Sequence, residues 1–460
     1  MPGSPRIDEE RLARFAESFS GELFRPGDNG YDQARRIFNG LVDRHPALIA
    51  RCRGSADVVN TLVLARESDR DVSVRGGGHN VSGRAVTDGG VMIDLTPMKA
   101  VHVDPQARTA RAGGGVTWQE FNDVTAEHGL ATTGGVISTT GVAGLTLGGG
   151  LGWLMGTHGL SVDNLLSVEL VTAAGDVVLV TADEYPDLFW ALRGGGGNFG
   201  VATSFEFRLH PLRQVYGGLV AHPFDAARDA LSFFRQFAGS VPDALSVMPL
   251  LVHAPDGSGV PLVAFAVCHT GPPDRAQADL EPLLSFGSPA LVQLGPMSYP
   301  AVNTMLDEGF PAGALYYWKS SFMADLDENV IDTLIDRFAT CPSPMTGIAI
   351  EHFHGAVTRV AVEATAVPHR EPGFDLLIAS GWTDPSATTA NVDWTRETYA
   401  AVEPHLARRR YVNYLDHDDA SDAVRAAYGP NFDRLSQVKR MYDPNNVFRL
   451  NHNIEPAATV

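Results

Sequence analysis

The stretch Arg75-Gly76-Gly77-Gly78-His79-Asn80-Val81-Ser82-Gly83 best predicts the fold of this 460-residue chain. Three consecutive glycines leave backbone without side chains, which can adopt positive φ and turn its N–H groups toward a phosphate. Val72 and Val74 alternate with polar residues just before it, so the stretch is predicted to follow a strand. A second strand is predicted over 91–95. The histidine directly after the glycines would hold a reactive ring nitrogen beside the bound group. The stretch therefore predicts a nucleotide-binding loop with an adjacent nucleophile.

Glycine clusters and loop histidines also occur in proteins without a nucleotide site. A histidine in a loop is often a structural residue, so the local sequence leaves both roles of His79 open. Linkers are rich in glycine too, but the glycines here lie between strand and helix patterns without a Ser or Pro bias. Gly195-x-Gly197-x-x-Gly200 matches the dinucleotide-binding fingerprint, but it follows a predicted helix instead of a strand. A Rossmann site is therefore not predicted, and no Gly-Lys-Ser or Gly-Lys-Thr indicates a Walker A loop.

Composition narrows the class of protein. The chain is 44% hydrophobic and 19% charged, and its net charge of −19 argues against nucleic-acid or anionic-membrane partners. No run of 18 apolar residues predicts a membrane span, and residues 1–10 contain no apolar segment typical of a secretory leader. Cys52, Cys268 and Cys341 are odd in number and widely spaced. We therefore expect a cytoplasmic protein without disulfides or structural zinc.

Glycine is concentrated between residues 70 and 200 and becomes sparse after about 215. This shift predicts a cofactor domain over 1–212, a substrate domain over 213–412, and a segment over 413–460 that returns to the first domain. In the first part, a capping box at Thr117 predicts a helix to His128, and the pattern over 165–180 predicts a hairpin. A helix is predicted from Pro186 to Arg193, and a strand over 205–209.

The second part mixes helical patterns at 226–237 and 330–339 with extended runs at 261–269, 347–353 and 374–382. These predict an antiparallel sheet backed by helices. The fold class is therefore α+β, with a helix in the segment 421–454.

The extended run 347–353 carries the candidates for chemistry in the second part. His352 and His354 have the spacing of two ligands on one strand face, but no third ligand is evident, so we predict a structural or substrate-lining role and no metal site. Glu351 would point to the opposite face. A carboxylate there is either a general base or a solvated or paired Glu, and the residues alone leave both open. No Gly-x-Ser-x-Gly supports a serine nucleophile.

Several further motifs together resemble the berberine-bridge-enzyme-like branch of the FAD-linked oxidases, in the vanillyl-alcohol-oxidase superfamily. The resemblance covers about residues 20–210 and 400–456 and is looser between them. Besides Val74–His79, it rests on the sequences at Gly141–Gly152, Gly159–Asn164, Leu192–Gly200, Tyr411–Tyr414 and Phe448–Ile454.

The resemblance implies a PCMH-type FAD-binding domain in two parts, with FAD joined through its 8α-methyl to the histidine that corresponds to His79. It also implies which residues line the cofactor: Arg75, Gly76, Gly77, Gly78, Asn80, Val81, Ser82, Gly83, Ile137, Ser138, Thr140, Gly141, Gly144, Leu145, Gly148, Gly150, Gly152, Trp153, Gly200, Val201, Tyr411, Asn413, Asn451 and Asn453.

The chain departs from the bicovalent members of that family at one place. They carry a cysteine in a Gly-Val-Cys motif that attaches to the flavin a second time, whereas this chain reads Gly135-Val136-Ile137-Ser138. The departure predicts a single covalent link, as in monocovalent bacterial members, with a less oxidising flavin and a less open site.

The resemblance implies an oxidase that transfers hydride from a C–H or alcohol of a small aromatic or polyketide-like secondary metabolite to flavin N5, with O2 as acceptor. Glu351 is the first candidate for the base, followed by Tyr316, Lys319, His352 and Tyr414. Thr140 is expected near the flavin, where a small polar residue lets O2 approach. Two alternatives stay open: a flavin-oxygenating tailoring enzyme, and a non-catalytic flavin-binding or redox-sensing protein.

Overall fold

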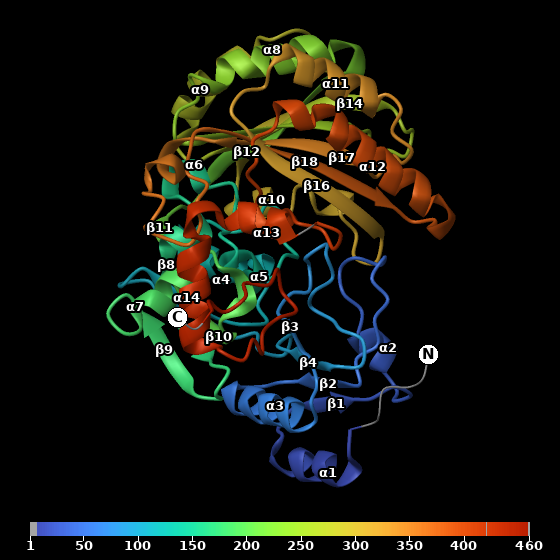
Figure 1. The fold of residues 1–460 in the computed structure, drawn as a ribbon. Coiled ribbons are helices and arrows are strands. Elements are labelled where there is room, and N and C mark those ends of the chain that lie inside the picture. Colours follow the sequence, from blue (N-terminus) through green and yellow to red (C-terminus); the bar gives the residue numbers. More distant parts are fainter. Residues whose placement is uncertain (1–6, 420, 459–460) are drawn as a thin grey trace.

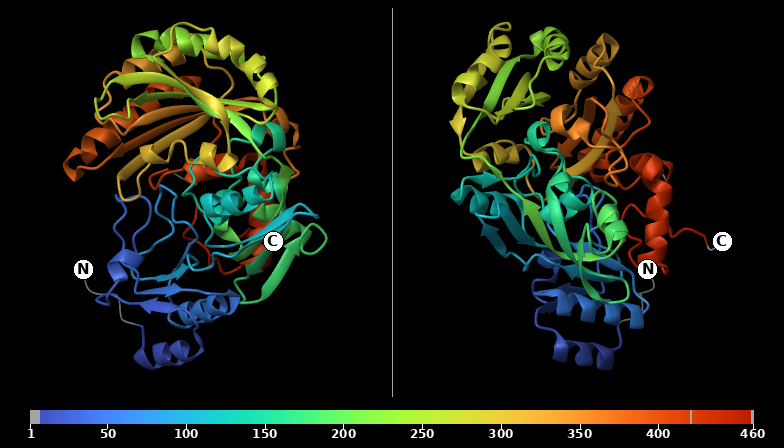
Figure 2. Two further views of the ribbon diagram at one scale, coloured as in Figure 1. Left: turned by 180° about the vertical axis from the view of Figure 1, so that it is seen from behind. Right: turned by 90° about the vertical axis from the view of Figure 1, so that its left-hand side faces the viewer.

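The computed structural model describes residues 7–419 and 421–458 (Figure 1). The stretch 1–6, which holds most of the region tested for a secretory leader, lies outside the described residues, as do 420 and 459–460. A small sheet with α1 (Glu9–Ser18) lies at one end of the molecule and a seven-stranded sheet at the other (Figure 2). The fold is α+β, as predicted.

The small sheet has the order β1 (Glu22–Phe24), β2 (Leu48–Arg51), β4 (Val91–Asp94) and β3 (Val72–Arg75). Strands β2, β4 and β3 are parallel, and β4 is buried along its whole length, as expected of a central parallel strand. Helix α3 (Ser55–Glu67) packs its buried residues against one face of this sheet, and α2 (Tyr31–Ala34) packs Tyr31 against the other face, beside Ile49 and Met92. β3 leads directly into Gly76–Gly78, so the predicted strand-to-loop arrangement is confirmed.

A second sheet is antiparallel throughout, in the order β5 (Val101–Asp104), β6 (Thr109–Gly113), β10 (Val201–Arg208), β8 (Leu165–Val171) and β9 (Val177–Thr181). β8 and β9 are the predicted hairpin. Helix α4 (Trp118–Glu127) begins with the predicted capping box, in which Thr117 Oγ1 and the Glu120 carboxylate accept from each other's backbone N–H. Helix α7 (Pro186–Leu192) is also confirmed. The strand pair β7 (Leu130–Ala131) and β11 (His210–Pro211) closes this part.

The large sheet contains seven antiparallel strands in the order β15 (Leu291–Met297), β12 (Val215–Pro223), β14 (Pro261–His269), β13 (Leu245–His253), β17 (Gly347–Phe353), β18 (Gly373–Trp382) and β16 (Leu315–Met323). Helices α8 (Ala227–Ala238), α9 (Pro273–Leu284), α11 (Glu328–Phe338) and α12 (Thr388–Val402) pack on one face, which confirms the predicted sheet backed by helices (Figure 1). The other face points toward the glycine-rich loops.

The C-terminal segment lies along the glycine-rich part of the molecule. It contains helices α13 (Ser421–Tyr428) and α14 (Phe432–Tyr442). The buried Lys439 of α14 donates from Nζ to the carbonyls of Asn198 at 2.7 Å and Phe448 at 3.1 Å. The short helices α5 (Val142–Leu147), α6 (Met155–His158) and α10 (Tyr299–Asn303) lie between this part and the large sheet (Figure 1). The turn 194–200 is therefore held between α7 and the C-terminal tail.

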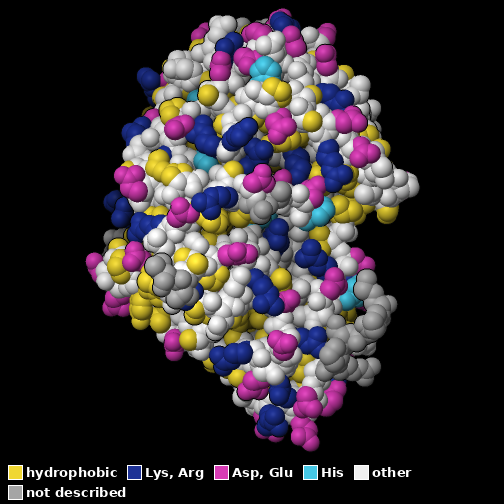
Figure 3. All heavy atoms as spheres, in the orientation of Figure 1, with side chains coloured by type: hydrophobic (Ala, Val, Ile, Leu, Met, Phe, Trp, Pro, Cys, Tyr) yellow, Lys and Arg dark blue, Asp and Glu magenta, His cyan; other side chains and the backbone are white. Residues whose placement is uncertain are grey.

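Acidic and basic side chains are intermingled over the face in Figure 3, with no large patch of one sign. Among the described residues, no helix combines the length and apolar character needed to cross a membrane.

Candidate active site

A large cavity lies between the glycine-rich loops and the open face of the seven-stranded sheet. Its walls come from the loop after β3, from the segment 135–151, from the turn 196–200 and from the C-terminal residues 411–414 and 451–452. The sheet contributes residues of β13, β16, β17 and β18. Because sheet side chains alternate in direction, only every second residue of these strands reaches the cavity.

The cavity brings together many of the residues predicted for the site. They are Gly76, Gly77, Gly78, His79, Asn80, Val81, Ile137, Thr140, Gly141, Gly144, Leu145, Gly200, Glu351, Tyr411, Asn413, Tyr414 and Asn451.

Other residues predicted for the cofactor site do not line the cavity: Arg75, Ser82, Gly83, Ser138, Gly148, Gly150, Gly152, Trp153, Val201 and Asn453. Several have clear structural roles instead. A Cβ on Gly152 would lie 1.6 Å from the carbonyl oxygen of Gly134, and one on Gly148 would lie 2.0 Å from Asn413 Oδ1. Ser138 donates to the carboxylate of Asp307 from its backbone N–H at 2.9 Å and from Oγ at 2.5 Å. These residues shape the loops from behind.

Sequence reasoning did not name the apolar cavity residues, which come from the large sheet and from the segment before β16, or a few polar ones. Met248, Leu250, Leu306, Phe310, Trp318 and Leu377 line the cavity, as do Arg84, Asn198 and His452. Met248, Leu250, Leu306 and Leu377 carry no sequence signal, since they look like ordinary core positions. Phe310 and Trp318 belong to the aromatic and apolar stretch 310–322, which favours a flat or hydrophobic substrate. Asn198 and His452 lie within motifs that the resemblance rests on, so proximity to those motifs could have indicated them.

His79 is held in an aromatic stack. Its ring lies 3.9 Å from that of Phe38 (centroid to centroid, 15° between planes), and Phe38 stacks in turn on Tyr316 at 4.6 Å. Burial lowers the pKa of His79 to about 4, so the imidazole is neutral at physiological pH. Its Nε2 has no hydrogen-bond partner among the described residues. A neutral imidazole with a free nitrogen can act as a nucleophile.

Glu351 lies on β17 and faces the cavity with only 5% of its surface exposed, so it is not a solvated surface carboxylate. Tyr414 donates its hydroxyl to Glu351 Oε1 at 3.1 Å, whereas Oε2 has no partner within the described parts of the chain. Burial raises the pKa of Glu351 to about 7, although the Tyr414 hydrogen bond opposes this. A carboxyl group that titrates near neutral pH suits a general base.

Three other base candidates do not line this cavity. Lys319 Nζ pairs with Asp418 and Asp419 at 2.8 Å each, on the face of β16 opposite to Trp318. Those two carboxylates raise the Lys319 pKa despite the opposing effect of burial. Tyr316 donates its hydroxyl to the carbonyl of Pro311 at 2.8 Å.

The third candidate, His352, lies beside a small neighbouring cavity with Trp153 and stacks on His354 at 4.3 Å. One group in the described chain has metal-ligand spacing, Asp416, His417 and Asp418, and it does not include these histidines.

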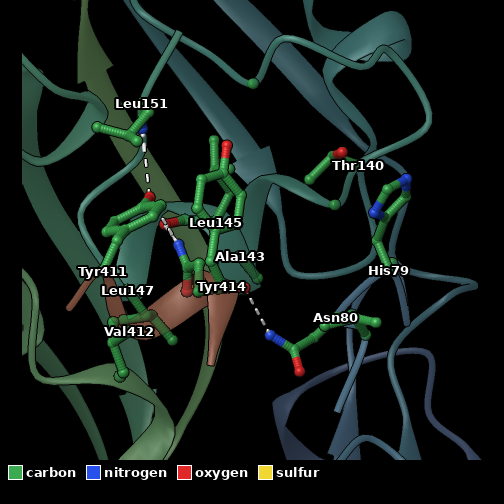
Figure 4. Close-up of a pocket in the computed structure, with 18 of the residues that line it drawn as sticks. His79, Asn80, Thr140, Ala143, Leu145, Leu147, Leu151, Tyr411, Val412 and Tyr414 are labelled. Carbon is green, nitrogen blue, oxygen red and sulfur yellow. Dashed lines mark hydrogen bonds between the residues drawn. The ribbon is translucent and has the colours of Figure 1, made fainter. Parts of the chain in front are cut away.

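Residues 411–414 tie the C-terminal segment to the loops of the cavity (Figure 4). The Tyr411 hydroxyl accepts from Gly150 N at 2.9 Å, from Leu151 N at 3.3 Å and from Asn413 Nδ2 at 2.8 Å. Asn80 Nδ2 donates to the carbonyl of Asn413 at 3.1 Å. These bonds hold Tyr414 over the cavity. Thr140 and His79 belong to another part of the wall (Figure 4), where their two loops meet, since a Cβ on Gly77 would lie 3.6 Å from the carbonyl carbon of Thr140.

The loops fit a nucleotide cofactor such as FAD. A Cβ on Gly77 would lie 2.5 Å from the backbone nitrogen of Gly141, so the two loops approach closely only because both residues are glycine. A Cβ on Gly144, which lines the cavity, would meet nothing within 4 Å. Glycine-rich backbone can approach phosphate oxygens, and His79 offers a free nitrogen at the same wall. The residues present therefore suit a dinucleotide with one reactive end.

Comparisons with known proteins agree with this arrangement. A family model described as FAD binding domain matches residues 46–181, and one described as berberine and berberine like matches 410–455. (R)-6-hydroxynicotine oxidase of Paenarthrobacter nicotinovorans is 32% identical over 95% of this chain and 97% of its own length. An FAD-linked oxidoreductase of Dictyostelium discoideum is 30% identical over 96% of each chain.

Solved structures also match the fold of this chain. The crystal structure of 6-hydroxy-D-nicotine oxidase from Arthrobacter nicotinovorans matches with a TM-score of 0.88 and 30% identity, covering 96% of this chain and 99% of the other. The Physcomitrella patens protein BBE-like 1 matches with a TM-score of 0.88 over 98% of this chain, and at 22% identity it supports the fold alone.

Proposed function

This chain belongs to the berberine-bridge-enzyme-like FAD-linked oxidoreductases and is an FAD-dependent oxidase, and from that premise we propose that it oxidises a small, flat, largely apolar substrate carrying a hydroxyl or amine. FAD, when bound, supplies the hydride acceptor and passes the electrons to O2. The observation that carries the proposal is the buried Glu351–Tyr414 pair at the cavity, beside apolar walls.

The substrate class follows from the residues around Glu351. Met248, Leu250, Leu306, Phe310, Trp318 and Leu377 form the nearby wall, and within the described chain Glu351 is the one acidic residue that lines the cavity. Such a surface favours an aromatic or polycyclic molecule over a sugar, whose hydroxyl groups need many polar partners. One relative of this chain is (R)-6-hydroxynicotine oxidase, and this similarity supports hydroxylated nitrogen heterocycles as candidate substrates.

We assign Glu351 as the base. Its Oε2 lacks a partner among the described residues and is free to accept a proton from the substrate hydroxyl or amine, while Tyr414 holds Oε1. Tyr414 stays neutral because burial, and then the charge of Glu351, raises its pKa well above the usual value. The hydrogen bond orients the carboxylate, and the apolar wall excludes water from it.

We assign His79 as the residue that joins FAD covalently, by one bond. Its neutral imidazole, with Nε2 unpartnered among the described residues, and its stack on Phe38 support this role. Ile137 lines the cavity where bicovalent relatives carry cysteine, and Cys52, Cys268 and Cys341 do not line it. Gly76–Gly78, Asn80, Gly141, Asn413 and Asn451 are assigned to cofactor binding, and Thr140 to the wall that O2 approaches.

The proposal also includes the domain boundaries and the cellular location. The division at residues 212 and 412 is supported by the large sheet, whose strands all lie between Val215 and Trp382. A cytoplasmic location is supported by the three cysteines, all of which are free thiols.

The test uses the purified holoprotein. Yellow colour that stays with the acid-precipitated protein supports covalent flavin, and colour in the supernatant contradicts the role of His79. Anaerobic bleaching is then measured with hydroxylated nitrogen heterocycles, benzylic alcohols and sugars, followed by O2 uptake and peroxide yield. Bleaching by aromatic members with one peroxide per turnover supports the oxidase. An oxygenated product indicates the tailoring alternative. A protein that none of these compounds bleaches would contradict the proposed substrate class and favour the flavin-binding alternative.

A further inference from the structure

A second buried acid lies beside the proposed base. In the register of β17 and β18, Glu351 is directly opposite Asp375, and the two strands are antiparallel. Directly paired residues project to the same face of a sheet with Cβ atoms about 4.5–5.5 Å apart. Leu377, two positions along β18, lines the cavity, so this is the face that carries Glu351 toward the site. The sheet therefore places two carboxyl groups side by side, with Glu351 in the cavity wall and Asp375 buried next to it.

Among the described residues, neither carboxyl has a compensating cation in contact. Asp375 is completely buried, and both of its carboxylate oxygens lack a hydrogen-bond partner there, as does Glu351 Oε2. The cationic side chain that acts on Asp375 is Arg410, and its guanidinium donates to Ser321 Oγ at 2.5 Å. No ion pair of Asp375 or Glu351 occurs in the described structure.

The other titratable groups that face the pair are neutral. Tyr411 and Tyr414 approach from the C-terminal segment, and burial raises the pKa of both hydroxyls above the usual value. On β16, Phe322 is opposite Asp375, and behind it burial lowers the pKa of His369 to about 4. Burial and the charge of Glu351 together raise the pKa of Asp375 well above normal, and Arg410 offsets part of this.

We propose that Glu351 and Asp375 form a carboxyl pair that holds one proton at neutral pH, with Asp375 as the positioning residue that keeps this proton while Glu351 carries the charge. Two unpaired carboxylates side by side in an apolar site cannot both ionise near neutral pH without a large cost. If the pair holds one proton, only one of the two groups is charged and that cost disappears. The hydrogen bond from Tyr414 and the open cavity favour the charge on Glu351, so the proton stays on Asp375. This inference rests on the proposed function only for the role of Glu351 as base.

The pair also gives the proton balance of one turnover. Glu351 Oε2 accepts one proton from the substrate hydroxyl or amine, while the hydride, with both electrons of the C–H bond, would go to the bound FAD. The pair then holds two protons and no charge. One proton returns to solvent before the next cycle, so the pair starts again with one.

The test counts ionisation steps, which does not require a substrate. Infrared spectra of the holoprotein are recorded across pH, following the carbonyl stretch of buried protonated carboxyl groups, for the wild type, Glu351→Gln, Asp375→Asn and the double variant. We expect two steps in the wild type and one in each single variant. The midpoint pH of the upper ionisation step in the wild type should lie at least about one pH unit above the midpoint of the step in either single variant. The reason is that interacting acids titrate as a pair. The double variant should show neither step.

Asp393→Asn, a change at an exposed residue of α12, is the matched control and should leave both steps unchanged. Two independent steps that reappear unshifted in the single variants would overturn the proposal, as would a wild type without a protonated buried carboxyl at pH 7. A variant that merely loosened the fold would broaden the bands instead of removing one step. If Glu351→Gln kept full flavin reduction while the pair titrated as expected, the assignment of the base would fail and the carboxyl pair would stand.

Discussion

The hydroxyl of Tyr414 lies 3.1 Å from Glu351 Oε1 and joins two segments that are 63 residues apart in the chain. Glu351 comes from the large sheet, and Tyr414 comes from a single turn that Asn413 and Tyr411 anchor to the glycine-rich loops. The proposed base is therefore completed only when the substrate-side sheet and the cofactor-side loops come together. This relationship makes the site sensitive to changes on either side.

Replacing the proposed base should slow the reductive step. We expect Glu351→Gln to reduce anaerobic flavin reduction by roughly 10²- to 10⁴-fold, as measured by stopped-flow absorbance with a substrate that bleaches the wild type. The wild-type rate should rise with pH through about 7, because the carboxylate is the active form. The variant should lose this rise. Glu127→Gln, on the exposed side of α4, serves as the control, and an unchanged rate in Glu351→Gln would exclude this base.

Removing the imidazole should release the cofactor from its covalent bond. We expect His79→Ala to bind FAD that acid precipitation extracts into the supernatant, since the glycine loops stay intact. The exposed His45→Ala variant should keep its colour in the pellet. Flavin that still precipitated with the His79→Ala protein would mean that another residue forms the bond.

The stack on Phe38 should matter for attachment more than for folding. Phe38→Leu keeps most of the apolar volume but removes the ring that lies 3.9 Å from His79, so the imidazole loses its fixed orientation. We expect a smaller fraction of acid-stable flavin, measured as pellet absorbance per protein. Phe233→Leu removes a comparable stack, on Phe286 at 4.6 Å, far from the cavity, and should leave this fraction unchanged. Equal losses in both variants would point to general destabilisation.

Lys319 should contribute to stability and not to chemistry. Its ammonium bridges Asp418 and Asp419 with little exposure, so Lys319→Met should lower the free energy of unfolding by about 1–3 kcal/mol. Urea titrations check this value, with the more exposed pair of Lys99 and Glu120 as control, where Lys99→Met should cost about 0–1 kcal/mol. Flavin reduction by the folded Lys319→Met protein should match the wild type. A large loss of rate would return Lys319 to the catalytic candidates.

Buried neutral histidines should make the protein sensitive to acid. Burial, and then the charge of Arg409, lowers the pKa of His369 to about 4 from an ordinary 6.5. As pH falls from 6.5 toward 4, His369 binds a proton in the unfolded chain but stays neutral in the folded chain, so the free energy of unfolding falls. His369→Gln removes this penalty, and its stability relative to the wild type should improve by about 2 kcal/mol between pH 7 and pH 5. Urea midpoints measure the difference, and parallel pH profiles of the two proteins would contradict it.

Local features could be predicted because neighbouring residues decide them. The capping box at Thr117, the hairpin of β8 and β9, and the strand before Gly76 all depend on contacts within a few residues. The glycines at 148–152 show the limit of this reasoning. Sequence marks a position where only glycine fits, but it does not say whether the close neighbour is a ligand or, as for Gly152, a backbone carbonyl.

Strand residues of the site were harder to predict for a different reason. Alternation separates Trp318 from Lys319, but only the packed sheet shows which of the two faces the cavity. Asp375 gave no signal at all, because its importance arises from the register that sets it opposite Glu351. A shift of that register by one residue would turn either side chain to the other face.

By itself, the sequence determined the α+β class, the glycine-rich nucleotide loop with its adjacent histidine, and the family that these motifs resemble. These depend on residue type and short spacing, which a linear chain displays directly. The tertiary structure alone decided that Tyr414 and Asp375 flank Glu351, that Phe38 stacks on His79, and that Lys319 lies away from the cavity. Those relationships join distant segments, and they exist only once strand register and the packing of the sheet on the loops have been set.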